Sequence, residues 1–237
     1  MTSASQAGSR VAFFGGSFDP PHLGHLSIAA AAQQALLLDR VLFAPVGLQP
    51  LKPAGSSASF SDRVAMIRLA IAGHSGFELS LLDAPNPGQP SPNYTFDTLT
   101  ELRKSLPSEA KLFLLLGADS FATLHQWHRA AELLFHANLI VASRPGESLG
   151  DLPSMLPAGV SIHAVDDRPN RYRLTNAAAD ESTLTILPDL QYDISATQLR
   201  AQIAGSTEQP PLLDPAVLAY IRSHALYRES VTNRQPL

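Results

Sequence analysis

Short apolar runs recur along the chain and are separated by polar or Ala/Leu-rich segments. The strongest runs occupy residues 11–14, 41–46, 77–82, 112–116 and 139–142, and weaker ones occupy residues 160–165 and 183–187. Each run has the length of a β-strand. The segment KLFLLLG, which includes the run at 112–116, is almost continuously apolar, which is typical of a strand buried on both faces.

Segments with helical periodicity lie between several of these runs. Residues 23–38 are rich in Ala and Leu, residues 62–72 place apolar side chains on one helical face, and residues 98–106 repeat that pattern. Ser59 and Asp62 form a capping pair ahead of the second helix. The alternation of strands and helices predicts an α/β fold, a doubly wound parallel sheet with helices on both faces.

The chain reads as one domain with irregular additions. We expect a disordered leader at residues 1–10, a single domain at 11–227 and a tail at 228–237. Residues 144–180 are rich in Pro, Gly and Asp and are interpreted as a variable insertion. Helical patterns return in residues 195–227, which predicts a C-terminal helical part.

Two irregular stretches interrupt the alternation. The loop at residues 47–59 contains prolines, glycines and serines and could fold over a ligand, whereas residues 83–93 carry four prolines and predict a rigid connection. A plain surface loop is the alternative for both.

Composition narrows the classes of function. The chain has 237 residues, of which 45% are hydrophobic and 16% are charged, so it can bury a full core. It has no cysteine, which excludes disulfides, iron–sulfur clusters, thiolate zinc sites and cysteine nucleophiles. The formal net charge of −4 argues against a general nucleic-acid-binding surface, so a phosphate ligand must meet a local cluster of donors.

Hydropathy and the first residues bear on location. No apolar run approaches the roughly 20 residues that cross a bilayer. Residues 1–10 lack the apolar stretch of a secretory signal. We therefore expect a cytoplasmic protein without membrane contact, and a homo-oligomer stays open.

The most informative segment is VAFFGGSFDPPHLGH at residues 11–25, which runs from an apolar strand through a Gly-Gly turn to a helix start. Glycines let the backbone approach a ligand closely, and the amides at a helix N-terminus favour an anion. His22 and His25 lie three positions apart, so on a first helical turn both imidazoles project the same way and can bind the same phosphates. Capping or packing of the helix is the plainer alternative. Metal binding is the lesser one, because no third ligand has an evident spacing.

This segment resembles the HxGH signature of the nucleotidyltransferase superfamily, and GGSFDPPHLGH is similar to the opening of bacterial nicotinate-nucleotide adenylyltransferases. Further stretches support that family in the right order: NYTFDTL, GADSFATLHQW, ASRPG, ISATQLR and the C-terminal YIRSHALY. Independent motifs in a fixed order compound in specificity. The resemblance spans nearly the whole chain and implies the Rossmann-like nucleotidyltransferase fold.

The resemblance implies transfer of the adenylyl group of ATP to nicotinate mononucleotide, which yields nicotinic acid adenine dinucleotide and pyrophosphate. The attacking phosphate oxygen needs no base near neutral pH, so alignment and charge neutralisation are the enzyme's tasks. Magnesium is the implied cofactor. We expect it to be held mostly by substrate oxygens and water, with no metal site made by the protein itself.

On this resemblance, the ATP phosphates meet His22, His25 and the backbone of the Gly-Gly turn, and His25 stabilises the transition state. Asp119 follows the buried strand and accepts from a ribose hydroxyl, with helix capping as the alternative. Asp19 precedes a proline, so a local turn role competes with ligand contact. The expected ATP-binding residues are Gly15, Gly16, Ser17, His22, His25, Gly117, Asp119, Ser195, Thr197 and Arg200.

The mononucleotide is expected at a second group of residues. Trp127 is the only tryptophan and matches the family position that stacks on the nicotinate ring, although a lone tryptophan is commonly core. Tyr94 and Thr95 match the motif that receives the nicotinate carboxylate. The expected residues are Tyr94, Thr95, Trp127, His128, Lys52 and Arg144, with a lesser part for His128 and an exposed structural arginine as the alternative for Arg144.

One stretch departs from the family pattern. Relatives often carry Pro-His-Lys in the loop after the second strand, whereas GLQPLKP here retains Lys52 and places Leu51 at the histidine position. Near the C-terminus, Ser195 begins a helix whose first amides can take phosphates. An ordinary capping box explains Ser195 and Gln198 but not Arg200. The expected catalytic set is His25, His22, Lys52 and Arg200.

Two other functions remain in view. A sister transferase could act on another phosphomonoester such as phosphopantetheine, but Trp127 and NYTFDTL favour the pyridine nucleotide. A catalytically silent nucleotide-binding module is the alternative from another class, and the retained histidines and cations speak against it.

Overall fold

A computed structural model of the chain describes residues 8–51, 55–86, 88, 91–143, 149–165, 168–188, 190, 195–205, 208 and 210–228. Within these residues one eight-stranded sheet runs in the order β3-β2-β1-β4-β5-β8-β7-β6. The strands are β1 (Arg10–Gly16), β2 (Arg40–Pro45), β3 (Phe77–Leu79), β4 (Lys111–Gly117), β5 (Asn138–Ala142), β6 (Val160–Ala164), β7 (Arg171–Asn176) and β8 (Glu181–Leu187).

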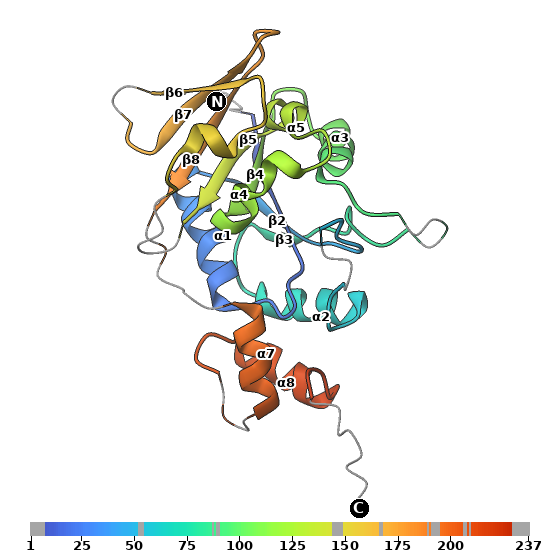
Figure 1. Cartoon of the computed structure of the whole chain (residues 1–237). Helices are drawn as coiled ribbons and strands as arrows, with labels where there is room; N and C mark the ends of the chain where they lie inside the picture. The colour runs from blue at the N-terminus through green and yellow to red at the C-terminus, as the bar shows by residue number, and fades with distance from the viewer. Residues whose placement is uncertain are drawn as a thin grey trace, which may run out of the picture.

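Helices connect most of these strands and complete the chain. They are α1 (Leu23–Leu36), α2 (Phe60–Ala70), α3 (Thr95–Ser105), α4 (Ala118–Ala122), the 3-10 turn η1 (Leu124–Gln126), α5 (Ala130–His136), α6 (Leu152–Met155), α7 (Ala196–Gly205) and α8 (Pro215–Ser223). Figure 1 shows α7 and α8 together at one end of the molecule and β6 and β7 at the other.

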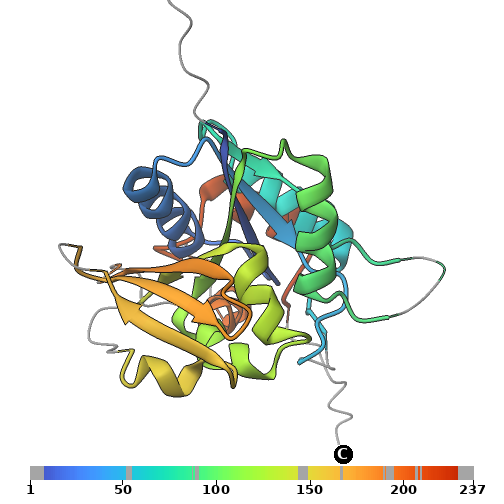
Figure 2. The same ribbon diagram turned by 90° about the horizontal axis from the view of Figure 1, so that it is seen from above.

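Alternate residues of each central strand point to opposite faces of the sheet, as the two-residue period of a strand requires. Ala12 and Phe14 of β1 pack in one core with α1, α2, α7 and α8, whereas Val11 and Phe13 pack in a second core with α3, α4, α5 and α6. Figure 2 shows α1 and α3 on opposite sides of the central strands. The predicted helices on both faces are confirmed.

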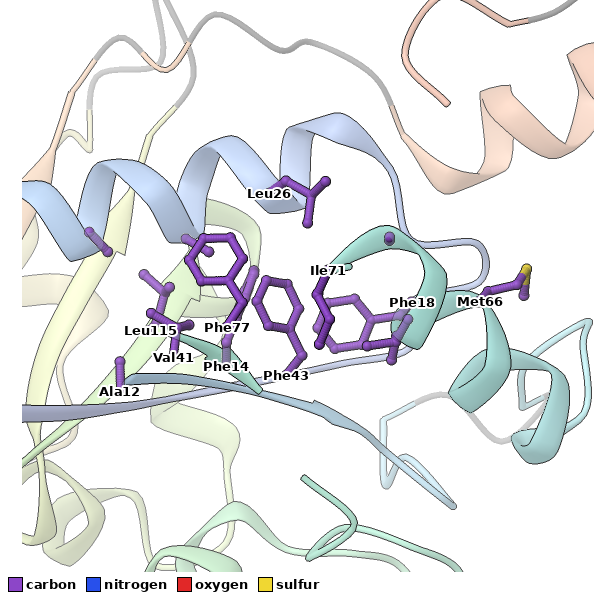
Figure 3. Packing of buried hydrophobic residues seen from close by; sticks show 14 of the residues in the cluster. Ala12, Phe14, Phe18, Leu26, Val41, Phe43, Met66, Ile71, Phe77 and Leu115 are labelled. Carbon is purple, nitrogen blue, oxygen red and sulfur yellow. The ribbon is translucent and has the colours of Figure 1, made fainter. Parts of the chain in front are cut away.

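The first core is dense in aromatic side chains next to Gly15 and Gly16, the last two residues of β1. Phe14 meets Phe18 and Phe43 with ring centroids 5.5 Å apart in both pairs. Leu26 of α1 and Ile71 after α2 lie beside these rings in Figure 3, and Met66 of α2 belongs to the same core. This packing gives the turn between β1 and α1 a rigid support, because well-packed cores resist displacement.

The apolar runs at 11–14, 41–46, 112–116 and 139–142 correspond to β1, β2, β4 and β5, so these four strand predictions are confirmed. The run at 77–82 was predicted too long, because β3 ends at Leu79. Arg10 was assigned to the leader, but it lies in β1, where its N–H donates to Asp39 Oδ2 at 2.7 Å.

Two larger differences concern the sheet. It is mixed, because β6 and β7 pair antiparallel and β7 pairs antiparallel with β8. Residues 149–165 and 168–180 of the predicted insertion therefore extend the sheet that carries the site. The strand β7 went unpredicted because RYRLTN is polar, and Leu174 is its one fully buried residue.

Candidate active site

A cavity of about 790 Å³ opens at the carboxyl ends of the parallel strands. The helices α1, α3, α4 and α7 all begin at its wall. A parallel sheet favours this arrangement, because its strands deliver their carboxyl ends to one edge. Among the predicted residues that the structure describes, all line this cavity: Gly15, Gly16, Ser17, His22, His25, Tyr94, Thr95, Gly117, Asp119, Trp127, His128, Ser195, Thr197 and Arg200.

The predicted Gly-Gly turn is wrong: Gly15 and Gly16 are the last two residues of β1, paired with β2, and the turn follows them. Both glycines line the cavity. A Cβ on Gly16 would lie 3.2 Å from the Phe18 ring, so a larger residue would press on the aromatic support of this segment. At Gly117, after β4, a Cβ would meet no atom within 4 Å. Since Gly117 lines the cavity, the missing side chain leaves that space to a ligand.

The two histidines stand together at the start of α1, as predicted. Their ring centroids are 3.8 Å apart, and the backbone N–H of His22 donates to His25 Nδ1 at 3.2 Å. Burial, with the neighbouring His22 second, holds the pKa of His25 well below its ordinary value. His25 is therefore neutral near pH 7, and because its Nδ1 is an acceptor, its proton sits on Nε2.

Asp19 has a structural position that the sequence did not reveal. It is buried and accepts from the backbone N–H groups of Ser57 at 2.5 Å and Ala58 at 3.0 Å. Its Oδ1 also accepts from the Tyr227 hydroxyl at 2.7 Å. These partners lie far along the chain, so the expectation of a local turn role for Asp19 is wrong.

Arg63 of α2 is a second residue that sequence reasoning missed. Its side chain is fully buried, and its guanidinium donates to the carbonyl oxygens of Ser17 at 2.7 Å and Val46 at 2.8 Å. It thereby ties the turn after β1 to the loop after β2. The available signal was its place on the buried face of α2, beside Met66 and Ile67.

The start of α7 forms the capping box that the sequence predicted. The Gln198 N–H donates to Ser195 Oγ at 3.2 Å, and the Ser195 N–H donates to Gln198 Oε1 at 2.9 Å. Arg200 is partly buried and donates to the Asp19 carbonyl oxygen at 2.8 Å and to Thr197 Oγ1 at 3.1 Å. The positive charge of Arg200 thus has a fixed place at the cavity.

Aromatic side chains line the cavity where it adjoins the second core. Tyr94 precedes α3, and its ring centroid lies 4.5 Å from that of His128. Trp127 is half-buried and lines the same region. Helix capping was the alternative for Asp119, and the structure places Gly117 at the N-cap of α4 with Asp119 in the first turn of that helix.

Asp83 is a buried cavity residue for which the sequence gave no role. Its Oδ1 accepts from the Thr98 hydroxyl of α3, and its carbonyl oxygen accepts from the Gly47 N–H at 2.7 Å. Burial, opposed by the Thr98 hydrogen bond, raises the pKa of Asp83 to about 6.

Two predicted residues, Lys52 and Arg144, lie outside the described residues. Across the described part of the chain, no three His, Asp or Glu side chains gather as a metal site would require. Within that part, no helix is long and apolar enough to cross a membrane.

Three comparisons place the chain among known proteins. Residues 13–202 match the family model described as cytidylyltransferase-like. A probable nicotinate-nucleotide adenylyltransferase of Gloeobacter violaceus is 39% identical over 93% of this chain and 97% of its own length. One of Chromobacterium violaceum is 40% identical over 93% of this chain and 99% of its own.

The fold comparison agrees with the sequence comparison. A Plasmodium falciparum nicotinic acid mononucleotide adenylyltransferase, solved in complex with NaAD, superposes with a TM-score of 0.67 at 14% identity, covering 92% of this chain and 97% of that one. At that identity the likeness shows the nucleotidyltransferase fold alone. Because it is 39–40% identical to these relatives over nearly its full length, the chain belongs to the nicotinate-nucleotide adenylyltransferase family.

Proposed function

We propose that this protein transfers the adenylyl group of ATP to nicotinate mononucleotide, forming nicotinic acid adenine dinucleotide and pyrophosphate in NAD biosynthesis. The supporting observation is a single cavity lined by two different groups of residues. One group is the histidine pair, Gly15, Gly16 and the start of α7, whose helices pack in the first core, and the other is Tyr94, Trp127 and His128, which adjoin elements of the second core. A triphosphate suits the first group and a pyridine ring the second.

In the proposed reaction, a 5′-phosphate oxygen of the mononucleotide attacks the α-phosphorus of ATP. One P–O bond forms there as the bond to the bridging oxygen of the β-phosphate breaks, and pyrophosphate leaves with that electron pair. No proton has to be removed from the nucleophile, because a phosphate monoester is already an anion near pH 7. The protein's task is to align the two phosphates and to stabilise charge.

His25 is the donor we assign to the α-phosphate. Its Nδ1 accepts a hydrogen bond from the backbone N–H of His22, so its Nε2–H is the donor that a neutral ring can offer to a ligand. A neutral donor strengthens its hydrogen bond as charge builds on the phosphate oxygens. The start of α7 and Arg200 are the groups that we assign to the β- and γ-phosphates.

Magnesium is proposed to enter with ATP. The carboxylates beside the first group do not form a cage: Asp19 is occupied by two backbone amides and Tyr227. This donor set fits a Mg²⁺ ion held by substrate oxygens and water. When bound, the ion would neutralise part of the polyphosphate charge.

The second group is proposed to select the acid over the amide. The nicotinate carboxylate would meet the start of α3 at Tyr94 and Thr95, which line the cavity, because the N-terminus of a helix favours an anion. The amide of nicotinamide mononucleotide brings its own N–H₂ donors toward these donors and leaves them unpaired. A mismatch of this kind costs several kcal/mol when the groups are buried.

The test is an assay of the purified protein with ATP, Mg²⁺ and each mononucleotide in turn, following pyrophosphate release. We expect turnover with both and a catalytic efficiency at least tenfold higher for nicotinate mononucleotide. Phosphopantetheine as acceptor is the control for the sister transferases. Pyrophosphate release with that acceptor and none with either mononucleotide would refute the proposed function.

A further inference from the structure

Residues near the C-terminus, Leu212 and Tyr227, bond to the segment between β1 and α1 at two points. The Tyr227 hydroxyl donates to Asp19 Oδ1 at 2.7 Å, across 208 positions of sequence. The Leu23 N–H, at the first residue of α1, donates to the Leu212 carbonyl oxygen at 2.9 Å. Residues 19–23, which include His22, are therefore held at both ends by residues near the C-terminus.

Asp19 joins four separate segments at this point. Its carboxylate accepts from Tyr227 and from the Ser57 and Ala58 amides before α2. Its carbonyl oxygen accepts from Arg200 Nη1 at 2.8 Å, while the same nitrogen stays 4.0 Å from Asp19 Oδ2. Arg200 is thus hydrogen-bonded to the backbone of Asp19 and forms only a long ion pair with its carboxylate.

The charges of this cluster favour an anion in the cavity. Arg200 contributes one positive charge and Asp19 one negative charge, and the buried Arg63, outside the cavity lining, adds a positive charge that interacts with Asp19. Burial and the hydrogen bond to Asp19 raise the pKa of Tyr227, so its hydroxyl remains a neutral donor. Asp19 and Arg200 both line the cavity.

We propose that Tyr227 is a positioning residue for ATP, which acts by occupying Asp19 Oδ1 and so keeping Arg200 available to the triphosphate. This inference rests on the proposed function. Without the hydroxyl, Asp19 Oδ1 keeps only the Ala58 N–H, so the carboxylate becomes more negative and draws in Arg200, whose Nη1 lies 4.0 Å from Oδ2. The closed ion pair would neutralise Arg200 and draw it away from the phosphates.

The chain offers a matched control in the same segment. The Tyr220 hydroxyl of α8 donates to Asp62 Oδ1 at 3.0 Å, which is also a tyrosine–carboxylate bond from the C-terminal segment. Asp62 is absent from the described lining of the cavity, whereas Asp19 belongs to it. Tyr227→Phe and Tyr220→Phe therefore remove the same kind of bond, and they differ in the carboxylate that is released.

The experiment measures steady-state kinetics with ATP and nicotinate mononucleotide varied separately, together with thermal unfolding. We expect Tyr227→Phe to raise the ATP KM about fivefold to tenfold and to leave the mononucleotide KM within twofold. Tyr220→Phe should leave both within twofold, with a similar loss of Tm. Equal kinetics in the two folded variants would overturn the proposal.

A double-mutant cycle tests the route through Arg200. In an Arg200→Ala background, Tyr227→Phe should change the ATP KM less than twofold, and an undiminished fivefold effect would refute the route. If Tyr227→Phe fails to fold, Arg200→Lys must show the same selective rise in ATP KM, and a normal value would overturn the proposal.

Calorimetry separates this inference from the proposed reaction. ATP binding is measured without an acceptor, so weaker binding in Tyr227→Phe than in Tyr220→Phe supports the positioning role even if nicotinate mononucleotide proves not to be the acceptor. Equal ATP affinities would sink the positioning role alone.

Discussion

The cavity has two walls, which are built in different ways. The phosphate wall, residues 15–25 with 195–200, is held by partly buried hydrogen bonds between distant segments, such as those that Asp19 accepts from Ser57 and Tyr227. The ring wall, residues 93–95 with 127–128, joins two short stretches through contacts such as the tilted pair of rings of Tyr94 and His128, with centroids 4.5 Å apart. His128 is exposed, whereas His22 is buried.

This difference matches what each wall would do. Phosphoryl transfer depends on alignment, and a displacement of about 1 Å can cost about a hundredfold in rate. A stacked ring tolerates small shifts, because dispersion and burial are not strongly directional. Lesions in the phosphate wall should therefore reduce turnover, and lesions in the ring wall should weaken binding of one substrate.

The largest effect is expected for His25→Ala. Loss of the Nε2–H donor should lower kcat at least about a hundredfold, or about 3 kcal/mol in the barrier, while the fold stays intact. Single-turnover kinetics and circular dichroism measure the two quantities. The control is His128→Ala, which deletes an exposed imidazole from the ring wall and should lower kcat less than tenfold. Similar kcat values for the two variants would break the comparison between the walls.

The second prediction concerns the carboxyl group beside the ring wall. The pKa of Asp83 is raised to about 6, so the folded state holds a proton that the unfolded chain releases near pH 4. This group's contribution to stability is therefore greatest below about pH 4 and is lost as pH rises through about 6. Asp83→Asn should remove that loss, which amounts to at most about 3 kcal/mol at pH 7.5.

Denaturant unfolding at pH 4.5 and pH 7.5 tests this prediction, with Asp62→Asn as the control. The Ser59 hydrogen bond lowers the pKa of Asp62, so that carboxylate stabilises the fold above its unfolded pKa, and the contribution is lost only below about pH 4. Relative to the parent protein, Asp83→Asn should gain stability between the two pH values, whereas the difference for Asp62→Asn should stay constant. A pH-independent difference for Asp83→Asn would contradict the prediction.

The central strands were predictable because strand-length apolar runs have few other uses in an α/β chain. Residues 112–116 are buried from both faces, and their sequence shows it. The polar strand β7 escaped prediction because one face of an antiparallel extension can stay solvated. The short helices α4 and α5 carry too few turns to display a period.

The cavity residues were predictable where a motif marks them, as in HLGH and NYT. Arg63, Asp83 and Tyr227 escaped because their roles depend on contacts between remote segments. Arg63 meets Ser17 across 46 positions, and Tyr227 meets Asp19 across 208. Local patterns carry no information about such pairs, although a cation on the buried face of α2 was a usable signal.

The third prediction sharpens the comparison from the ring wall. Trp127→Ala should raise the KM for nicotinate mononucleotide about tenfold, because a stacking surface is lost, and should leave the ATP KM within twofold. Steady-state kinetics with each substrate varied in turn measures both values. Phe77→Leu, in the first core behind the sheet, is the control for general loosening of the fold. A larger rise in the ATP KM would place Trp127 at the other wall.

The smallest effect is expected at the start of α7, where one hydroxyl is proposed to serve two purposes. Ser195 caps the helix through the Gln198 N–H and also lines the cavity. Ser195→Ala should therefore lose about 1 kcal/mol of stability and bind ATP several-fold more weakly. Asp214→Ala is the matched control, because Asp214 caps α8 through the Ala216 N–H at 2.7 Å and is absent from the described cavity lining. Both variants should lose similar stability in thermal unfolding, but calorimetry should show weaker ATP binding in Ser195→Ala alone. Equal ATP affinities would mean that Ser195 is only a helix cap, and that the histidine pair, Gly15, Gly16 and Arg200 bind the phosphates without it.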